Sequence, residues 1–413
     1  MSHNSVEVAI IGGGAAGIAA ARKLAVHGVD YLIVEARARL GGRACTVADK
    51  SGYALDLGCG WLHSADRNPW VAVATAQGRV FDKATPPWGR TTMTDIFPLE
   101  QQRGFRRAMG EMYQRVAEAA ATGRDRAVSE LLPPDGPWNG MLNAVATYIA
   151  GAEFDRMSTV DFDRYEDSEI NWRLPGGYGA MIAAHGEGLN VAFDSAVKRI
   201  DHRGKRIVLE TAKGNIEAER VIVTLPTNVI ADNEDLFLPA LPHKFEAARG
   251  LPLGLDIKQF IALDRAEEFE EESRVFGRTD RAGTGNYHFR PFGRPMIECY
   301  FAGRWAQELE GGGEAAFFDF AVSELTGLFG GDFARRLTPL RIHRWGADPY
   351  ARGAYSYAVP GAADERGVLA ATVDDRLYFA GEACSRHDFS TAHGAFITGV
   401  EAADRLIAAR RKS

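Results

Sequence analysis

Runs of apolar residues predict an α/β start and an α/β end for this chain. The mostly apolar runs at residues 6–11 and 29–35 are typical of strands buried in a parallel sheet. The alanine-rich segment between them predicts a helix that ends near Gly28. Near the C-terminus a strand is predicted in 376–381 and a helix over 394–411. We therefore expect both ends of the chain to contribute to one α/β domain.

The middle of the chain predicts a second domain. Apolar residues at helical spacing predict helices over 97–121 and 138–150, and residues 161–172 form an acidic segment that we expect to be irregular. Strands are predicted within 191–223, 253–263, 286–301 and 338–345, and a further helix within 313–330. This order predicts two interleaved domains: an α/β dinucleotide-binding domain of residues 1–85, 172–235 and 345–413, and an α+β domain of residues 86–171 and 236–344.

The turn after the first strand carries a dinucleotide-binding signature. The sequence GGGAAG follows a strand and opens a helix, and Glu35 stands 18 residues after Gly17. Gly12 permits the tight turn, Gly14 lets a pyrophosphate approach the backbone, and Gly17 lets helix and strand pack closely. The free N–H groups of the helix would bind the phosphates, and Glu35 would bind the ribose hydroxyls. The alternative is an alanine- and glycine-rich turn without a ligand.

Three arginines follow the second strand. Arg37, Arg39 and Arg43 flank the pair Gly41 and Gly42, so their guanidinium groups could lie beside a pyrophosphate. A solvated basic turn is the alternative.

Composition limits the partners and the location. The chain has 413 residues and a net charge of −7, which disfavours nucleic acid or an anionic membrane as the main partner. We expect no signal peptide and no membrane span, because strand pattern begins at Val6 and no run approaches ~18 apolar residues. The four cysteines form no CxxC pair, so we expect a reducing, cytoplasmic location and no bound metal.

Four segments resemble the flavin-containing amine oxidase family, which includes monoamine oxidases, polyamine oxidases and lysine-specific histone demethylases. They are EARARLGGR after the second strand, PLGLDIKQFIALD, RWGADPYARGAYSYAVPG and LYFAGEACSRHDFSTAHGAFITGVEAA. They occur in the family's order over nearly the whole chain, and the pattern is most similar to that of polyamine oxidases. The resemblance implies a Rossmann-like FAD-binding domain interleaved with a substrate-binding domain, with the boundaries given above.

The resemblance also implies which residues bind FAD. Ala354 occupies the position at which some monoamine oxidases carry a cysteine bound to the flavin, so we expect FAD to be held without a covalent bond. Together with the glycine motif, the resemblance assigns the cofactor to Gly12, Gly14, Ala16, Gly17, Glu35, Ala36, Arg37, Gly42, Arg43, Gly58, Cys59, Gly60, Trp61, Val197, Trp345, Gly381, Glu382, Thr391 and Ala392.

The same resemblance names the catalytic candidates. Lys258 matches a lysine that holds a water at flavin N5; the alternative is a lysine on an edge strand that faces solvent. Tyr355 matches an aromatic wall of the substrate cavity, and Thr391 stands where other members place a second tyrosine. His63 matches a histidine that contacts substrate amines, and His393 is a further pocket candidate. Core packing or a single hydrogen bond is the alternative for the tyrosine and the histidines.

The expected reaction is hydride transfer from an amine to flavin N5, giving an imine and then an aldehyde, with O2 reoxidising the flavin to give hydrogen peroxide. A polyamine or a related primary or secondary amine is the expected substrate. The acidic residues Asp161, Asp163, Glu166, Asp167 and Glu169 could attract it to a channel mouth, or could form a solvated loop.

Other functions stay open at this stage. An L-amino-acid oxidase would need an arginine that binds the substrate carboxylate, and Arg90, Arg290 and Arg304 are candidates. A monoamine oxidase, a dehydrogenase with another electron acceptor, and a flavin-bearing partner-binding protein without turnover are further alternatives. The sequence does not indicate the oligomeric state.

Overall fold

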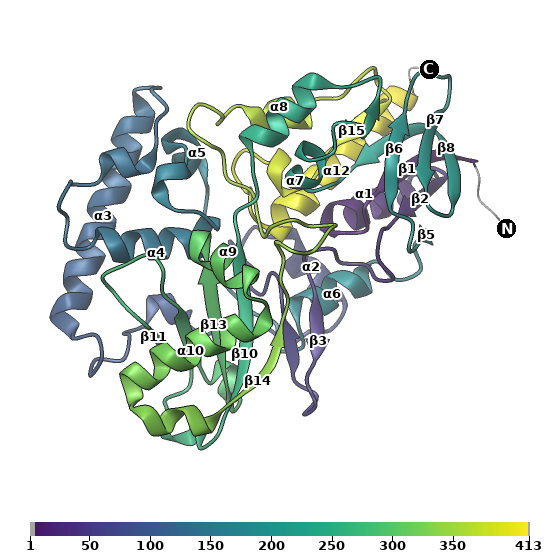
Figure 1. The fold of residues 1–413 in the computed structure, drawn as a ribbon. Coiled ribbons are helices and arrows are strands. Elements are labelled where there is room, and N and C mark those ends of the chain that lie inside the picture. Colours follow the sequence, from purple (N-terminus) through teal and green to yellow (C-terminus); the bar gives the residue numbers. More distant parts are fainter. Residues whose placement is uncertain (1–4, 412–413) are drawn as a thin grey trace.

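A twisted, mostly parallel sheet forms the first domain in the computed structural model, which describes residues 5–411 (Figure 1). Its strand order is β5-β2-β1-β8-β7-β6-β9, and β15 also pairs with β8. The strands are β1 Ser5–Ile11, β2 Tyr31–Val34, β5 Val191–Ala192, β6 Val197–Asp201, β7 Ile207–Thr211, β8 Gly214–Val223, β9 Phe237–Leu238 and β15 Leu377–Phe379. β1 lies between β2 and β8 and is parallel to both, as its apolar sequence predicts.

Small residues let two helices from opposite ends of the chain pack against this sheet. α1 (Ala15–Val26) lies beside α12 (Ala392–Arg410). A Cβ on Gly399 would lie 2.2 Å from the Ala16 carbonyl oxygen, and one on Gly17 would lie 1.9 Å from that of Gly12. No larger residue fits at either position, so the predicted close packing at Gly17 is present.

The second domain is built on an antiparallel sheet of strand order β11-β12-β13-β10-β14. Its strands are β10 Asp256–Leu263, β11 Ser273–Phe276, β12 Asn286–Phe289, β13 Met296–Ala302 and β14 Leu337–Ile342. Within 286–301, where the sequence predicts strand structure, the chain forms two strands, β12 and β13, which are joined by a turn at Pro291–Gly293. Proline has no N–H for the ladder, and Arg290 and Phe292 adopt left-handed φ angles of 51° and 58° there.

Helices surround the second sheet. α3, α4 and α5 lie on one side of it and α10 lies near β11, β13 and β14 (Figure 1). The second-domain helices are α3 Leu99–Ala121, α4 Asn139–Ala150, α5 Thr159–Arg164, α9 Gly303–Gly311 and α10 Glu314–Phe329. The remaining elements are β3 Thr46–Ala48, β4 Ala54–Asp56, α2 Pro69–Ala76, α6 Tyr178–His185, α7 Thr227–Ala231, α8 Pro242–Gly250 and α11 Glu365–Ala370.

Two predicted features differ from the structure. The start of the acidic segment is helical, because the Ser158 side chain accepts from the N–H of Asp161 at 2.9 Å and so caps α5. Residues 237–251, which the sequence analysis placed in the second domain, pack with the first sheet: Phe237, Phe245 and Leu251 belong to its apolar core.

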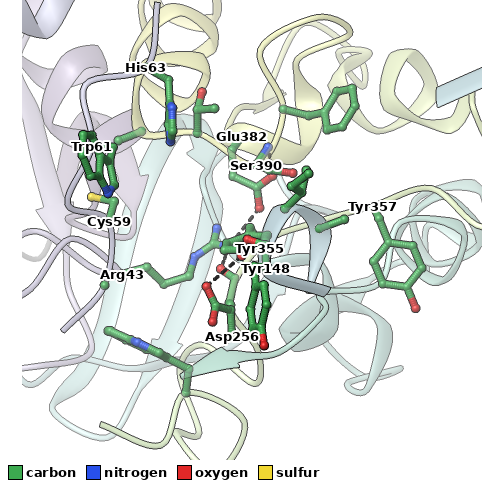
Figure 2. Close-up of a pocket in the computed structure, with 18 of the residues that line it drawn as sticks. Arg43, Cys59, Trp61, His63, Tyr148, Asp256, Tyr355, Tyr357, Glu382 and Ser390 are labelled. Carbon is green, nitrogen blue, oxygen red and sulfur yellow. Dashed lines mark hydrogen bonds and ion pairs between the residues drawn. The ribbon is translucent and has the colours of Figure 1, made fainter. Parts of the chain in front are cut away.

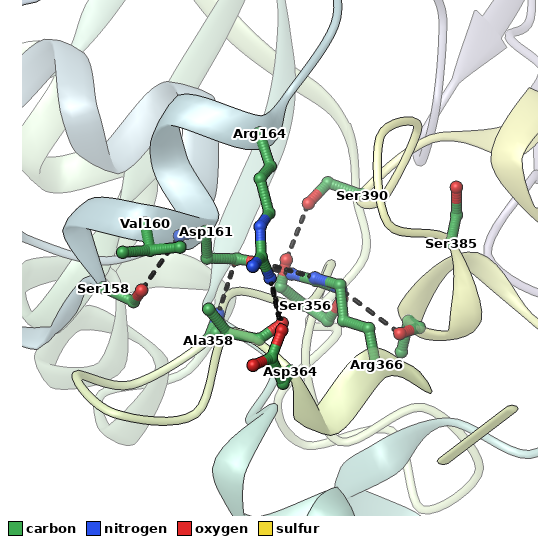
Figure 3. Close-up of polar contacts among 12 residues, drawn as sticks. Ser158, Val160, Asp161, Arg164, Ser356, Ala358, Asp364, Arg366, Ser385 and Ser390 are labelled. Carbon is green, nitrogen blue, oxygen red and sulfur yellow. Dashed lines mark hydrogen bonds and ion pairs between the residues drawn. The ribbon is translucent and has the colours of Figure 1, made fainter. Parts of the chain in front are cut away.

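A buried ion pair joins the two predicted domains. The guanidinium of Arg366 donates to both carboxylate oxygens of Asp161 at 2.6 and 2.8 Å, and both side chains are buried (Figure 3). Arg366 also donates to the Ser356 hydroxyl at 2.9 Å. The sequence analysis left Asp161 either at a channel mouth or in a solvated loop; its carboxylate oxygens instead bind Arg366 and the N–H of Ala358.

Two further observations concern the described residues. All four cysteines are unpaired thiols, and three of them are buried. Within residues 5–411, no helix combines the length and the apolar character that crossing a membrane requires.

Candidate active site

A large cavity, about 1830 Å³ in volume, is lined by residues of both domains. Typical small-molecule pockets measure roughly 300–1,000 Å³, so this one has room for a dinucleotide and a second molecule. Every residue that the sequence analysis assigned to FAD or to the catalytic pocket lines it, with the exceptions of Gly17, Arg39 and His393. Gly17 serves the packing of α1 instead, as described above.

The nucleotide end of the cavity is formed by the turn between β1 and α1. Gly12 has a φ of 103°, and a Cβ there would lie 2.6 Å from the Thr224 hydroxyl, so the turn requires glycine. The buried Glu35 carboxylate accepts from the N–H groups of Gly13 and Arg37 at 2.7 and 2.8 Å. Glu35 thus holds the turn as well as lining the cavity.

The three arginines after β2 have different partners. Arg37 donates to Asp348 at 2.5 Å and lines the cavity. Burial raises the pKa of Asp348, but its hydrogen bonds with His343 and Arg37 outweigh this and hold it well below its usual range. Arg39 donates to the carbonyls of Leu40 and Gly42 and does not line the cavity, so the expectation that it binds a pyrophosphate was wrong.

Arg43 and Glu382 form an ion pair in the cavity wall. The guanidinium donates to Glu382 at 2.9 Å and to the Ala354 carbonyl at 2.7 Å (Figure 2). Glu382 also accepts from the Ser356 hydroxyl at 2.6 Å and the Ser390 N–H at 2.9 Å. Burial opposes ionisation of Glu382, but Arg43 and Ser356 lower its pKa, so it is an anion at neutral pH.

The loop from Gly58 to Trp61 places backbone in the cavity. A Cβ on Gly58 would lie 1.7 Å from the Arg43 carbonyl oxygen, and one on Gly60 would lie 2.9 Å from Lys258 Nζ. Burial raises the pKa of the Cys59 thiol to about 12, so this cysteine is neutral. The indole of Trp345 donates to the carbonyl of Leu57 at 2.9 Å, which fixes the start of the loop.

Lys258 lies in the middle of the second sheet, on β10 between β13 and β14. The alternative of an edge-strand lysine facing solvent is therefore excluded. The side chain is 9% exposed, and its Nζ lies 3.4 Å from Glu298 Oε1. Burial raises the pKa of Glu298, but Lys258 and His288 lower it to about 2. An ammonium beside an ionised carboxylate is thus held at the cavity wall.

An ionic chain leads from Lys258 across the sheet. Glu298 Oε2 lies 3.5 Å from His288 Nδ1, and His288 Nε2 lies 2.7 Å from Glu272. Glu272 in turn pairs with Arg173 at 2.7 Å. Each carboxylate in this chain therefore already has a cationic or hydrogen-bonding partner.

Tyr355 shares a hydrogen bond with a carboxyl group that the sequence analysis did not name. Its hydroxyl lies 2.8 Å from the Tyr148 carbonyl oxygen and 2.9 Å from Asp256 Oδ2 (Figure 2). Burial raises the pKa of Asp256 to about 7. Asp256 and Lys258 are two residues apart in β10 and so point to the same face; this spacing was the signal that could have identified Asp256.

The other catalytic candidates differ in what their polar atoms do. The Thr391 hydroxyl donates to the Asp388 carbonyl at 2.6 Å and accepts from the Gly394 N–H at 2.9 Å, which caps α12. The hydroxyl of Thr391 is therefore already used in the cap, and what this residue provides to the cavity is a side chain smaller than tyrosine. His63 lines the cavity with Nδ1 2.6 Å from Asn171 Oδ1, and burial lowers its pKa.

His393 is not a pocket residue. It is buried, its Nε2 lies 3.1 Å from Asp388 Oδ1, and it does not line the cavity. The expectation from the sequence was wrong, because position 393 lies one helical step beyond the cavity-lining residues Thr391 and Ala392.

Charged residues at the cavity wall determine which charged groups of a substrate could be bound there. Asp163, Asp167 and Glu169 line the cavity with exposed side chains, whereas Glu166 lies outside and contacts Arg67 at 3.7 Å. Of the arginines considered for a carboxylate, only Arg90 lines the cavity. Arg290 is bound to Phe269 and Glu271, and Arg304 to Asp155.

The residues present fit FAD, the cofactor predicted from the sequence. α1 begins at the cavity without a side-chain cap, so its N–H groups are free to bind a pyrophosphate. A Cβ on Gly14 would have no atom closer than 3.8 Å, which leaves open space above the turn. Arg37 and Arg43 supply positive charge, and the loop at Gly60 faces Lys258 where the flavin ring is expected.

The chain matches the family described as flavin containing amine oxidoreductase over residues 15–85 and 89–407. Polyamine oxidase 4 of Oryza sativa subsp. japonica is 29% identical over 437 residues, covering 96% of this chain and 88% of that protein. Lysine-specific histone demethylase 1 homolog 1 of the same subspecies is 28% identical over 450 residues, covering 98% of this chain. The chain spans about half of that relative, 53% of its length.

The fold is also shared with solved structures. Putrescine oxidase bound to putrescine has a TM-score of 0.80 and 18% identity, with 98% of this chain and 99% of that one covered. The predicted two-domain amine oxidase fold is therefore confirmed. With the family match spanning nearly all the residues that line the cavity, the chain belongs to the flavin-containing amine oxidoreductases, and FAD is its cofactor.

Proposed function

We propose that this protein oxidises an amine. When bound, FAD accepts a hydride from the carbon next to the amine nitrogen, and water hydrolyses the resulting imine. The observation that carries the proposal is Lys258, whose buried ammonium lies at the cavity wall against the backbone of Gly60. A cation in this position can hold a water molecule in the cavity by hydrogen bonding.

Aromatic residues around Lys258 would orient the amine. Tyr148, Tyr300 and Tyr355 line the cavity, and burial raises the pKa of each phenol well above its usual range. They are therefore neutral, and their ring faces attract an amine without supplying a formal charge. Desolvation in such a pocket lowers the pKa of the substrate ammonium and favours the neutral amine, which releases hydride more readily.

A polyamine or a related primary or secondary amine is the proposed substrate class. The exposed carboxylates of Asp163, Asp167 and Glu169 at the cavity wall support it, since they would concentrate cations. We further propose O2 as electron acceptor with hydrogen peroxide as product, and a cytoplasmic location, which the four unpaired thiols support.

Anaerobic mixing of the FAD-loaded protein with polyamines, monoamines and L-amino acids tests the proposal. Bleaching of the flavin absorbance by an amine supports it, and subsequent mixing with air distinguishes an oxidase from a dehydrogenase. If no amine bleaches the flavin, the proposal fails and a non-catalytic flavoprotein becomes the better description.

A further inference from the structure

Arg274 is a cation in the cavity wall that has no anionic partner among the described residues. It lies on β11 and lines the cavity, and its guanidinium carbon is 4.9 Å from the ring centroid of Phe276. Its Nε is buried without a hydrogen-bond partner, and within residues 5–411 no carboxylate pairs with it. Burial lowers the pKa of Arg274 to about 10, so the side chain is still charged at neutral pH.

The neighbouring carboxylates are already paired. Glu272 binds Arg173 and His288, both at 2.7 Å. Glu298 lies 3.4 Å from Lys258 and 3.5 Å from His288, which pairs with Arg274 across the β11–β12 ladder. Arg274 is therefore a cation on this face of the sheet whose charge neither Glu272 nor Glu298 balances. Keeping a charge in a half-buried wall without a partner is costly, and a bound anion would offset that cost.

Resting on the proposed amine oxidation, we propose that Arg274 binds a carboxylate at the end of the substrate remote from the oxidised carbon. The planar guanidinium can bind both oxygens of a carboxylate in parallel, which favours this group over a single point charge. The second ammonium of a simple diamine would be repelled at the same position. Within the proposed class of primary and secondary amines, this favours an ω-amino carboxylate, or an N-substituted relative of one, over a polyamine.

The sheet geometry sets the separation of the two ends. Lys258 pairs with Tyr300, Tyr300 with Asn286, and Asn286 with Phe276, so Lys258 and β11 are three strand spacings apart, roughly 14 Å. Arg274 is two residues from Phe276 and shares its face. The carboxylate of an α-amino acid adjoins the reacting carbon and would remain near Lys258. Several methylene groups are needed to reach Arg274.

Chain-matched amines test this assignment on the FAD-loaded enzyme. The probes are 1-aminooctane, 1,8-diaminooctane and 8-aminooctanoate, together with their six-carbon counterparts, and the readout is kcat/KM for anaerobic flavin reduction. In the wild type we expect the amino carboxylate to be preferred over the diamine at one chain length or both. In Arg274→Gln the ratio of kcat/KM for amino carboxylate to alkylamine should fall roughly tenfold to a hundredfold, the range for a lost charged hydrogen bond.

Two further variants make the result specific. Arg274→Lys keeps the charge but loses the planar fork, so it should retain only part of the preference. Arg106→Gln removes an exposed arginine that also lines the cavity, from α3, and should leave the ratio within twofold of wild type. An equal fall in Arg106→Gln would mean that general surface charge causes the preference, which overturns the proposal.

Binding of hexanoate, which has no amine to oxidise, separates this inference from the proposed function. Calorimetry should show at least tenfold weaker binding to Arg274→Gln than to wild type, with flavin content used to confirm that the variant is folded. Equal binding to both overturns the role of Arg274, whether or not amines bleach the flavin. If hexanoate binding depends on Arg274 but no amine bleaches the flavin, the anion site stands and amine oxidation fails.

Discussion

Replacing Asp161 with asparagine should strongly destabilise the protein, although Asp161 is predicted neither as a catalytic residue nor as an FAD-binding residue. Arg366 is fully buried and donates two hydrogen bonds to Asp161, at 2.6 and 2.8 Å (Figure 3). Its guanidinium carbon also lies 3.8 Å from the ring centroid of Phe389, so water cannot replace the lost carboxylate on that side. The substitution therefore removes the carboxylate that is directly paired with a buried charge.

The size of the effect follows from that burial. Removing one partner of a buried ion pair typically costs about 3–5 kcal/mol of unfolding free energy. Asparagine keeps the shape and one acceptor oxygen, so we expect about 3 kcal/mol, measured by urea unfolding of the FAD-loaded protein. Replacing both partners, Asp161→Leu with Arg366→Met, should recover part of the loss because no unpaired charge is left.

Asp163→Asn is the matched control. Asp163 lies two residues further along α5 and is exposed, and the same chemical change there should alter the unfolding free energy by less than about 0.5 kcal/mol. A loss below about 1 kcal/mol in Asp161→Asn, or one no larger than in Asp163→Asn, would refute the argument from buried charge.

Three other outcomes follow from the site. Lys258→Met should retain FAD but slow flavin reduction or reoxidation in stopped-flow measurements, and unchanged rates in both half-reactions would remove Lys258 from the chemistry. Acid or heat should release all the flavin, since Ala354 offers no attachment atom; flavin absorbance left on the denatured chain would contradict this. Asp256→Asn should stabilise the protein more at pH 8 than at pH 5. In the wild type this carboxyl has a pKa of about 7 in the folded state against an ordinary value of 3.8, so the unfolding free energy of the wild-type protein falls as the pH rises through this interval. A difference in unfolding free energy between variant and wild type that does not change with pH would show that Asp256 titrates normally.

The parts of the site that depend on local backbone chemistry could be predicted from the sequence. The GGGAAG turn needs glycine at position 12 because φ is 103° there, and such a requirement is visible in the residue itself. Glu35 follows at the end of β2, and it lines the same cavity.

Residues whose role depends on pairing between distant segments were not predictable in the same way. Asp161 looked like one member of an exposed acidic run, and only the approach of Arg366, 205 positions later, shows that it is buried. Arg39 and Arg37 are indistinguishable by spacing, yet Asp348 binds only Arg37. In each case the decisive partner lies in another domain segment, and the sequence carries no sign of which segments meet.

The substrate-facing sheet shows why charge counts along the chain are a poor guide to specificity. Arg274, Lys258, His288 and Asp256 line the cavity, and Glu298 lies on the same face of the sheet opposite His288. Along the sequence these residues alternate with apolar residues that belong to the core behind the sheet. Glu298 is neutralised by Lys258 and His288, and burial raises the pKa of Asp256 to about 7, so each acid loses much of its effect on a ligand. The charge of Arg274 is not offset, because no carboxylate within residues 5–411 pairs with it. The exposed acidic residues of the cavity wall would attract the amine end of a substrate, whereas the interior favours an anion, and a molecule that carries both charges at separate ends satisfies both.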